Sequence, residues 1–227
     1  IEQAAERIAP HIKYTPLSYD PELNIYIKWE NHQVTGSFKV RGALNKVLSL
    51  QDWERQQGLV TASAGNHGQG VALAASLYGI PVTVFASEHA VPDKIKAMRK
   101  MGAEVIQVAG GYAEAEAAGI AHAHHNRATW ISPYNDGQII AGQGTIGLEI
   151  LAELTAKTTR NWIVPAGGGG LVCGIGTVLK AQEHRPRLIA AQSEASPFLH
   201  AIFYRGTQDG VVELDSLADG LAGPVET

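Results

Sequence analysis

The chain has 227 residues, with 18 lysines and arginines against 22 aspartates and glutamates, so its formal net charge is −4. Hydrophobic residues make up 45% and charged residues 18%, which excludes an intrinsically disordered chain. A mildly acidic chain without a basic tract argues against nucleic acid as a partner. The single cysteine, Cys173, excludes an internal disulfide and a cysteine-rich zinc site, and its apolar neighbours predict a small core residue.

No uninterrupted apolar run approaches the roughly 20 residues that a membrane-spanning helix needs. No basic-then-apolar signal segment opens the sequence. We therefore expect a cytoplasmic protein without a membrane partner. Because the first residue is Ile1 rather than methionine, we expect that residues before it were trimmed or lie outside this sequence.

Short apolar runs alternate with longer helical patterns along the chain. The patterns predict strands at residues 24–29, 58–63, 80–86, 104–108, 129–132, 161–165 and 188–193. They predict helices at residues 37–49, 66–78, 92–101, 112–126, 145–154, 171–183 and 197–204. Ser37 is a plausible N-cap of the first helix. This order of strands and helices predicts an α/β fold of parallel twisted sheets with helices on both faces.

In open α/β sheets, ligands bind at the carboxyl ends of the strands. Two such junctions are rich in glycine, at residues 63–70 and 165–170. At the second, four consecutive glycines lead from a strand into a helix, where backbone N–H groups and the helix N-terminus favour a phosphate. The spacing matches neither the dinucleotide fingerprint nor the Walker A loop. The alternative is a tight turn, but four glycines cost more unfolded-state entropy than a turn alone requires.

The junction at residues 63–70 also runs from a strand into a helix through small residues. Ser63, Asn66 and His67 supply side-chain donors beside exposed backbone N–H groups, which suits a substrate carboxylate. An N-cap Ser or Asn with a buried His explains the same residues. Taken alone, this motif leaves both interpretations open.

Lys39 falls in the first turn of a predicted helix, between Phe38 and Val40. A cation at a helix N-terminus is disfavoured, and partial burial disfavours the charge further. Both effects favour a neutral amine, the form that a Schiff-base nucleophile or proton-shuttling base requires. Most lysines are solvated surface residues, so this segment alone favours the simpler interpretation.

Two other groups of residues are weaker evidence for a functional site. His122, His124 and His125 lie on an alanine-rich helix without carboxylates at ligand spacing, which favours a solvated helix face over a metal site. Ser63, His67 and Asp136 contain the residue types of a hydrolase triad, but the nucleophile elbow is absent.

A Schiff-base lysine, a phosphate cradle and a carboxylate loop together describe an enzyme that holds an aldehyde-phosphate cofactor and an amino acid. The chain resembles the pyridoxal-phosphate enzymes of fold type II, most closely the threonine/serine dehydratase (ammonia-lyase) and serine racemase branch. The resemblance rests on segments 37–43, 63–70, 167–171 and 218–220, which occur in the family's order and span nearly the whole chain.

The resemblance implies a role for each matching residue. Lys39 matches the lysine that forms a Schiff base with pyridoxal 5'-phosphate, and Phe38 matches its neighbour near the cofactor ring. Asn66 matches the amide that bonds the pyridine 3-oxygen, and Gly220 matches a backbone contact to the cofactor. The residues that match the phosphate cradle are Gly167, Gly168, Gly169, Gly170 and the N–H of Leu171. The residues that match the substrate carboxylate loop are Ser63, Asn66 and His67.

The family fold resembles the β subunit of tryptophan synthase, with a smaller domain inserted in a large one. The resemblance implies a large cofactor-binding domain over residues 1–50 and 138–227 and a small domain over 51–137, and it implies a homodimer. Family members continue beyond Thr227, and the residue that bonds the pyridine nitrogen lies in that stretch. We therefore expect the C-terminal part of the large domain to be missing from this chain.

The implied activity is α,β-elimination from a hydroxy amino acid such as L-threonine or L-serine, giving a 2-oxo acid and ammonia. Lys39 would remove the α-proton. The alternatives are an amino-acid racemase, a β-replacement synthase of the same fold, or a non-catalytic amino-acid-binding domain. In the racemase a serine supplies the second proton; Ala64 stands at the matching position here and has no proton to give.

The sequence also departs from a divalent-cation site of related enzymes. That site pairs a glutamate with an aspartate six residues later. Glu194 fits the first position, but His200 stands at the second, with Phe198 between them. We therefore predict no bound metal.

Overall fold

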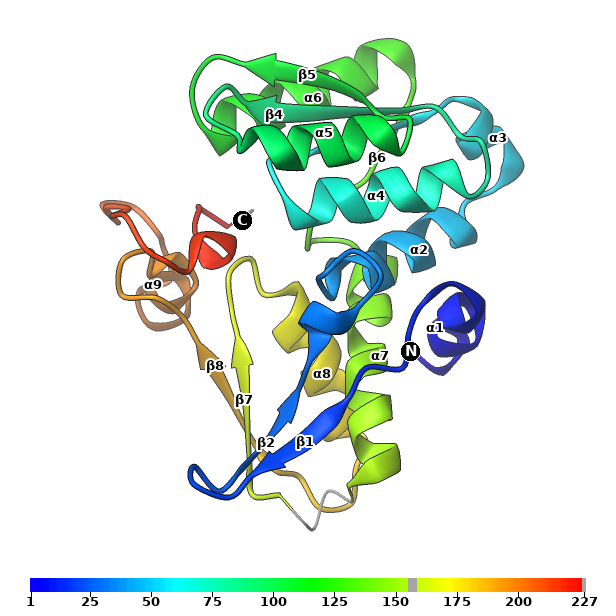
Figure 1. Ribbon diagram of the computed structural model, residues 1–227. Helices are drawn as coiled ribbons and strands as arrows, with labels where there is room; N and C mark the ends of the chain where they lie inside the picture. Colours follow the sequence, from blue (N-terminus) through cyan, green and yellow to red (C-terminus); the bar gives the residue numbers. More distant parts are fainter. Residues whose placement is uncertain (155–158, 226–227) are drawn as a thin grey trace.

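The computed structural model describes residues 1–154 and 159–225 and shows them in two lobes (Figure 1). One lobe contains a four-stranded parallel sheet in the order β5-β4-β3-β6. Its strands are β3 (Leu59–Ala62), β4 (Val82–Ser87), β5 (Glu104–Val108) and β6 (Thr129–Trp130). Parallel strands need crossover connections, and helices supply them here.

Helices cover both faces of this sheet. They are α4 (Asn66–Ser76), α5 (Pro92–Lys100) and α6 (Tyr112–Asn126), while the short helix α3 (Asp52–Gln56) precedes β3. Val71 of α4 and Met98 of α5 pack with Val84 in one buried cluster, whereas Ala115 of α6 packs with Phe85 in another. Adjacent strand residues thus point to opposite faces, so α4 and α5 cover one side and α6 the other.

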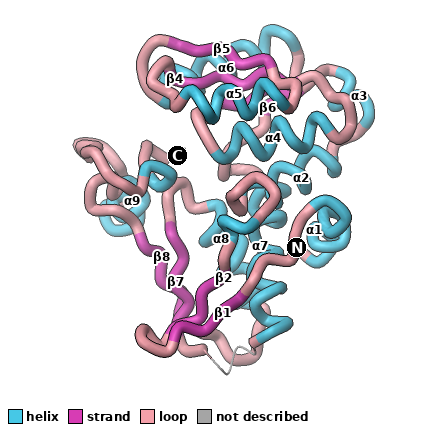
Figure 2. The backbone as a smooth tube through the Cα atoms, viewed as in Figure 1, coloured by secondary structure: helices cyan, strands magenta, loops and turns pink. Residues whose placement is uncertain are grey.

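The second lobe contains two separate pairs of strands, drawn in magenta in Figure 2. One pair is antiparallel, β1 (Leu17–Asp20) with β2 (Ile25–Lys28), and the other is parallel, β7 (Asn161–Pro165) with β8 (Arg187–Ala191). The helices of this lobe are α1 (Glu2–Ile8), α7 (Gly137–Glu153), α8 (Gly170–Lys180) and α9 (Phe198–Arg205), with short 3-10 turns η1 (Ala9–His11), η2 (Glu30–His32) and η3 (Asp219–Leu221).

Helix α2 (Lys39–Ser49) lies between the lobes and packs against both α4 and α7. Glycines permit these close approaches. A Cβ on Gly70 of α4 would lie 3.2 Å from the Val40 backbone, and one on Gly142 of α7 would lie 2.6 Å from the Arg41 carbonyl oxygen. The start of α2, which carries Lys39, is thereby held close to both lobes.

The structure corrects the expectation for Cys173, which is exposed rather than buried in the core. Helix α8 turns Gly174 and Val178 inward, where a Cβ on Gly174 would lie 2.5 Å from the carbonyl oxygen of Ile140 in α7. Cys173 is one residue, or about 100°, away from Gly174 around the helix, and it shares the outward face with Thr177. In the described part of the chain, no helix has the length and apolar character required to cross a membrane.

Candidate functional site

A cavity of about 690 Å³ lies where the two lobes meet. The elements that line it are far apart in sequence: the start of α2, the turn between β3 and α4, the segment after β6, the turn after β7 and η3. The predicted site residues that line it are Phe38, Lys39, Ser63, Asn66, His67, Gly167, Gly168 and Gly220. Gly169, Gly170 and Leu171 are not among its lining residues; Gly169 caps α8, and the other two form its first turn.

Lys39 is the first residue of α2 and reaches into this cavity. Its Nζ donates a hydrogen bond to the carbonyl oxygen of Pro133 at 2.8 Å and lies 5.6 Å from the centroid of the Phe38 ring. Burial disfavours the ammonium form and lowers the pKa of Lys39 to about 8. A pKa of 8 leaves roughly one amine in ten neutral at pH 7, against about one in 3,000 for an ordinary lysine.

This pKa predicts a distinct pH profile for acylation of Lys39. Only the neutral amine is a nucleophile, so reactivity rises with pH as the proton leaves. We expect half-maximal acetylation by acetic anhydride near pH 8, read by mass spectrometry of the Lys39 peptide. Nα-acetyl-lysine in the same tube is the standard, with its midpoint at about pH 10.4. A Lys39 midpoint equal to that of the standard would contradict the prediction.

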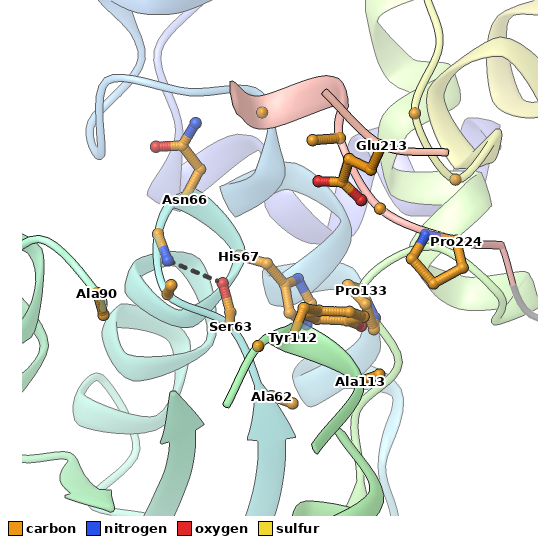
Figure 3. A pocket seen from close by; sticks show the side chains of 18 of the residues that line it. Ala62, Ser63, Asn66, His67, Ala90, Tyr112, Ala113, Pro133, Glu213 and Pro224 are labelled. Carbon is orange, nitrogen blue, oxygen red and sulfur yellow. Dashed lines mark hydrogen bonds between the residues drawn. The ribbon is translucent and has the colours of Figure 1, made fainter. Parts of the chain in front are cut away.

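The turn after β3 presents donors to the cavity. Ser63 Oγ accepts a hydrogen bond from the N–H of Gly65 at 3.1 Å, drawn as the dashed line in Figure 3. Helix α4 begins at Asn66, whose side chain is exposed. The first N–H groups of a helix have no partner within it and carry the positive end of the helix dipole. This turn therefore suits an anionic group such as a carboxylate.

The imidazole of His67 is buried, with 3% of the residue exposed. Its Nε2 lies 3.3 Å from the carbonyl oxygen of Ile131. Because a carbonyl only accepts, Nε2 carries the proton in that bond and Nδ1 is left as an acceptor. Burial, with a smaller contribution from the charge of Lys39, lowers the pKa of His67 to about 3, so the ring is neutral. A neutral ring in this tautomer does not donate to a carboxylate from Nδ1, which leaves the backbone N–H of His67 as its donor.

In the glycine run at residues 167–170, Gly168 and Gly170 lie too close to Tyr134 for any side chain. A Cβ on Gly168 would lie 2.4 Å from two ring atoms of Tyr134, and one on Gly167 would lie 3.3 Å from the Leu221 backbone. Gly169 has φ +88°, in the left-handed region that favours glycine. The run leads into the N-terminus of α8, a helix of 11 residues. Backbone N–H groups at such a turn form an anion site.

Several cavity residues were not predicted from the sequence. Pro133 and Tyr134 follow β6, and the rule that ligands gather at the carboxyl ends of strands would have found them. Tyr112 begins α6 after β5, at the same sheet edge. Glu213 lies in an irregular segment without any helix or strand pattern, so periodicity gives no signal for it.

Asp136, considered for a hydrolase triad, is engaged elsewhere. Its Oδ1 caps α7 by accepting from the N–H groups of Gln138 and Ile139, and its Oδ2 pairs with Lys46 Nζ at 2.7 Å. Within the described residues, no three histidine, cysteine, aspartate or glutamate side chains are grouped so that they could hold a metal ion.

The model of a family described as "pyridoxal-phosphate dependent enzyme" matches residues 4–227. The chain belongs to this family. The resemblance stated from the sequence is thereby confirmed.

Two relatives carry names of the predicted branch, ammonia-lyase and dehydratase. The chain is 41% identical over 98% of its length to a protein of Thermotoga maritima named L-threonine ammonia-lyase, and covers 56% of that relative. It is 41% identical over 97% of its length to a Staphylococcus aureus protein named L-threonine dehydratase catabolic TdcB, and covers 65% of that one. The chain thus spans between about half and two thirds of the length of these relatives.

Solved structures of the family share the fold and confirm the predicted fold class. Maize serine racemase superposes with a TM-score of 0.89 at 31% identity, over 99% of this chain and 70% of that one. The processed form of threonine deaminase isoform 2 from Solanum lycopersicum superposes with a TM-score of 0.88 at 30% identity, over 99% of this chain and 69% of that one.

The residues of the cavity fit pyridoxal phosphate. The cofactor needs an amine for its aldehyde, an anion cradle for its phosphate and apolar contacts for its ring. Lys39 and the turn at Gly167 and Gly168 line one cavity together with Phe38. The lowered pKa of Lys39 and the glycine turn fit the first two requirements.

Proposed function

We propose that the protein is a pyridoxal-phosphate-dependent ammonia-lyase that converts a hydroxy amino acid, such as L-threonine or L-serine, to a 2-oxo acid and ammonia. The observation that carries the proposal is that Lys39, an amine with a pKa of about 8, shares one cavity with Gly167 and Gly168 of the glycine run. The relatives named L-threonine ammonia-lyase and L-threonine dehydratase support the reaction class.

When bound, the cofactor supplies an aldehyde for covalent attachment and a ring that withdraws electrons from the substrate α-carbon. The backbone N–H groups of Gly167 to Gly170 and of Leu171 would hold the phosphate at the start of α8. The Asn66 amide and the backbone of Gly220 would hold the ring. The N–H groups at the start of α4, with Ser63 Oγ, hold the substrate carboxylate.

Lys39 takes the α-proton of the substrate on its neutral Nζ. The electron pair left on the α-carbon forms the double bond to the β-carbon as the hydroxyl leaves, and a proton makes that hydroxyl into water. Addition of water to the released unsaturated amine then frees ammonia and the 2-oxo acid, so the substrate as a whole loses only ammonia. Burial of Lys39 serves this step because a permanently charged lysine cannot accept the proton.

The test is a screen of hydroxy amino acids for release of 2-oxo acid by the purified protein supplied with pyridoxal phosphate. We expect L-threonine or L-serine to give product, and borohydride reduction to leave the cofactor bonded to Lys39 in the peptide map. Cofactor bonded to Lys39 without product from any hydroxy amino acid would favour a non-catalytic binding domain. Absence of cofactor from Lys39 would overturn the proposal.

The racemase alternative predicts a different outcome at Ala64, which lines the cavity. Its methyl group exchanges no proton, so we expect elimination with less than about one D-enantiomer per hundred turnovers. Ala64→Ser adds a hydroxyl and is expected to raise D-serine formation from L-serine about tenfold or more, measured by chiral chromatography. Ala64→Gly, which adds no hydroxyl, is the control. Equal racemisation by wild type and Ala64→Ser would contradict this assignment.

The proposal includes two structural expectations. We propose that residues 51–137 form a small domain inserted in a large one made of 1–50 and 138–227, and that the protein is a homodimer. Sedimentation equilibrium tests the dimer. Limited proteolysis at residues 50–52 and 136–138, with and without pyridoxal phosphate, tests the boundaries.

A further inference from the structure

Arg41 is a fully buried charge beside the reactive lysine. It lies two residues after Lys39 in the first turn of α2, and its exposed fraction is 0%. Burial of a guanidinium is costly unless its donors are paired. The role proposed above for Lys39 makes no use of Arg41, so its burial at this position calls for another explanation.

All five N–H donors of Arg41 are paired. Nε and Nη2 donate to Glu30 at 2.8 and 2.9 Å, and Nη1 and Nη2 donate to Glu149 at 2.6 and 3.0 Å. The remaining Nη1 donor reaches Thr145 Oγ1 at 3.1 Å. Two bidentate pairs fix both the position and the plane of the guanidinium. Burial opposes its charge, but the two carboxylates outweigh that effect and raise the pKa of Arg41.

A second cation completes the group, which we call the Arg41 cluster: Lys28, Glu30, Arg41 and Glu149. Lys28 Nζ lies 2.6 Å from Glu149 Oε2 and donates to the Thr15 carbonyl oxygen at 2.7 Å. The cluster therefore balances two positive charges against two negative ones. Its members come from β2, η2, α2 and α7, so it joins four elements at the start of α2.

Outside the Arg41 cluster, the start of α2 is held by close packing against α4 and α7 and by a few hydrogen bonds, among them that of the Gly42 N–H to Gln143 Oε1 at 3.2 Å. Its N-cap, Phe38, makes no side-chain cap hydrogen bond. Ser37 Oγ accepts from the Lys39 N–H at 3.3 Å, a long contact. The bond from Lys39 Nζ to the Pro133 carbonyl oxygen reaches the segment that leads into α7, the same helix that supplies Glu149. Arg41 and Lys39 thus both connect the first turn of α2 to α7 or to its approach.

We propose that Arg41 is a positioning residue: its two bidentate pairs set the orientation of the first turn of α2 and thereby the place of the Lys39 amine in the cavity. As a role in catalysis, this inference rests on the proposed function. The competing explanation is that the Arg41 cluster stabilises the fold and nothing more. The two explanations differ in what happens to Lys39 when the fold survives.

Arg41→Lys is the main variant, because it keeps the positive charge but has no planar fork for two carboxylates. Leu44→Ala is the matched control: Leu44 is on the same helix, is 0% exposed, and its truncation leaves a cavity that lowers stability without touching the Arg41 cluster. Thermal midpoints of both variants are measured first, so that effects on Lys39 are compared at similar losses of stability. If Arg41→Lys does not fold, Glu30→Gln replaces it.

The first readout is the pH midpoint of Lys39 acetylation, measured on folded protein without cofactor or substrate. We expect Arg41→Lys to move it upward by about one pH unit, because a loosened first turn admits water to the amine. Leu44→Ala is expected to leave it unchanged. Equal midpoints for Arg41→Lys and Leu44→Ala would overturn the inference. This readout stays decisive even if the wild type releases no 2-oxo acid, which would defeat only the proposed function.

The second readout uses the enzyme loaded with pyridoxal phosphate and L-threonine. Misplacement of a reacting group lowers the rate of the chemical step more than it lowers substrate affinity. For Arg41→Lys we expect kcat to fall about 10- to 100-fold with KM changed less than about twofold. Loss of kcat by the same factor in Leu44→Ala would assign the effect to stability alone.

Discussion

Lys39→Ala is expected to lower 2-oxo acid release from L-threonine by about 10³-fold or more, because the proposed role assigns both covalent attachment and proton transfer to one amine. Alanine removes the bond to the cofactor and the base in a single change. The expected spectrum of Lys39→Ala supplied with pyridoxal phosphate lacks the absorbance of the lysine-bound form, and borohydride reduction leaves the peptide of residue 39 unmodified. Steady-state release of 2-oxo acid measures the rate.

Lys96→Ala is the matched control for this prediction. Lys96 lies on α5 with its side chain 69% exposed, and its Nζ lies 3.4 Å from Asp93 Oδ1. A surface pair of this kind contributes at most about 1 kcal/mol, so Lys96→Ala is expected to keep activity within about twofold. Added methylamine, which restores a base in the space left by the lysine side chain, is expected to recover part of the rate of Lys39→Ala. Activity of Lys39→Ala close to that of the wild type would exclude the proposed role.

The chemical character of Lys39 could be predicted only in part from its own segment, which taken alone favoured a solvated surface lysine. A lysine in the first turn of a helix beside Phe38 and Val40 is both unfavourably placed for a positive charge and partly covered. Burial is the cause found for its lowered pKa. The Pro133 carbonyl that receives its hydrogen bond lies 94 residues away, and no local pattern connects the two segments.

For the fold, too, local segments were predicted from the sequence, whereas features that depend on distant contacts were not. Strand β5 (Glu104–Val108), helix α6 (Tyr112–Asn126) and strand β7 (Asn161–Pro165) have the predicted bounds, because a glycine or a polar residue lies within two residues of each end. Helix α7 was predicted from residue 145, but it starts at Gly137 under an Asp136 cap. Gly142 and Gly144 obscured the helical pattern, and they let α7 cross α2 and α8 at close range.

Helix α1, helix α3 and strand β1 were not predicted. Strand β1 (Leu17–Asp20) pairs antiparallel with β2, although the alternating order of strands and helices indicated only parallel pairing. Its four residues include none that is fully buried, so alternation of apolar and polar side chains gives a weak signal there. Pairing with β2, which is a tertiary interaction, determines this strand.

Gly168→Val is expected to raise the dissociation constant of pyridoxal phosphate about 10- to 100-fold. The Cβ alone would lie 2.4 Å from the ring of Tyr134. The backbone of Tyr134 packs closely against Gly170, where a Cβ would lie 2.9 Å from the Tyr134 carbonyl oxygen. This close packing limits how far Tyr134 can move away from a side chain at position 168. Overpacking of this kind costs roughly 1–3 kcal/mol, and each 1.4 kcal/mol is about a factor of ten in affinity. Titration of the apoprotein, followed by cofactor absorbance, measures the constant.

Gly137→Ala is the control for that substitution, because no atom lies within 4 Å of a Cβ placed there and the position begins a helix. Gly137→Ala is expected to bind pyridoxal phosphate with a dissociation constant within about twofold of the wild-type value. Tyr134→Ala combined with Gly168→Val separates two physical causes, because removal of the ring relieves the clash but not the space that valine takes from the phosphate. Partial recovery in the double variant would assign the loss to Tyr134. Wild-type affinity in Gly168→Val itself would mean that the phosphate does not rest on this turn, and the glycine run would then be a close-packed strand–helix junction and no more.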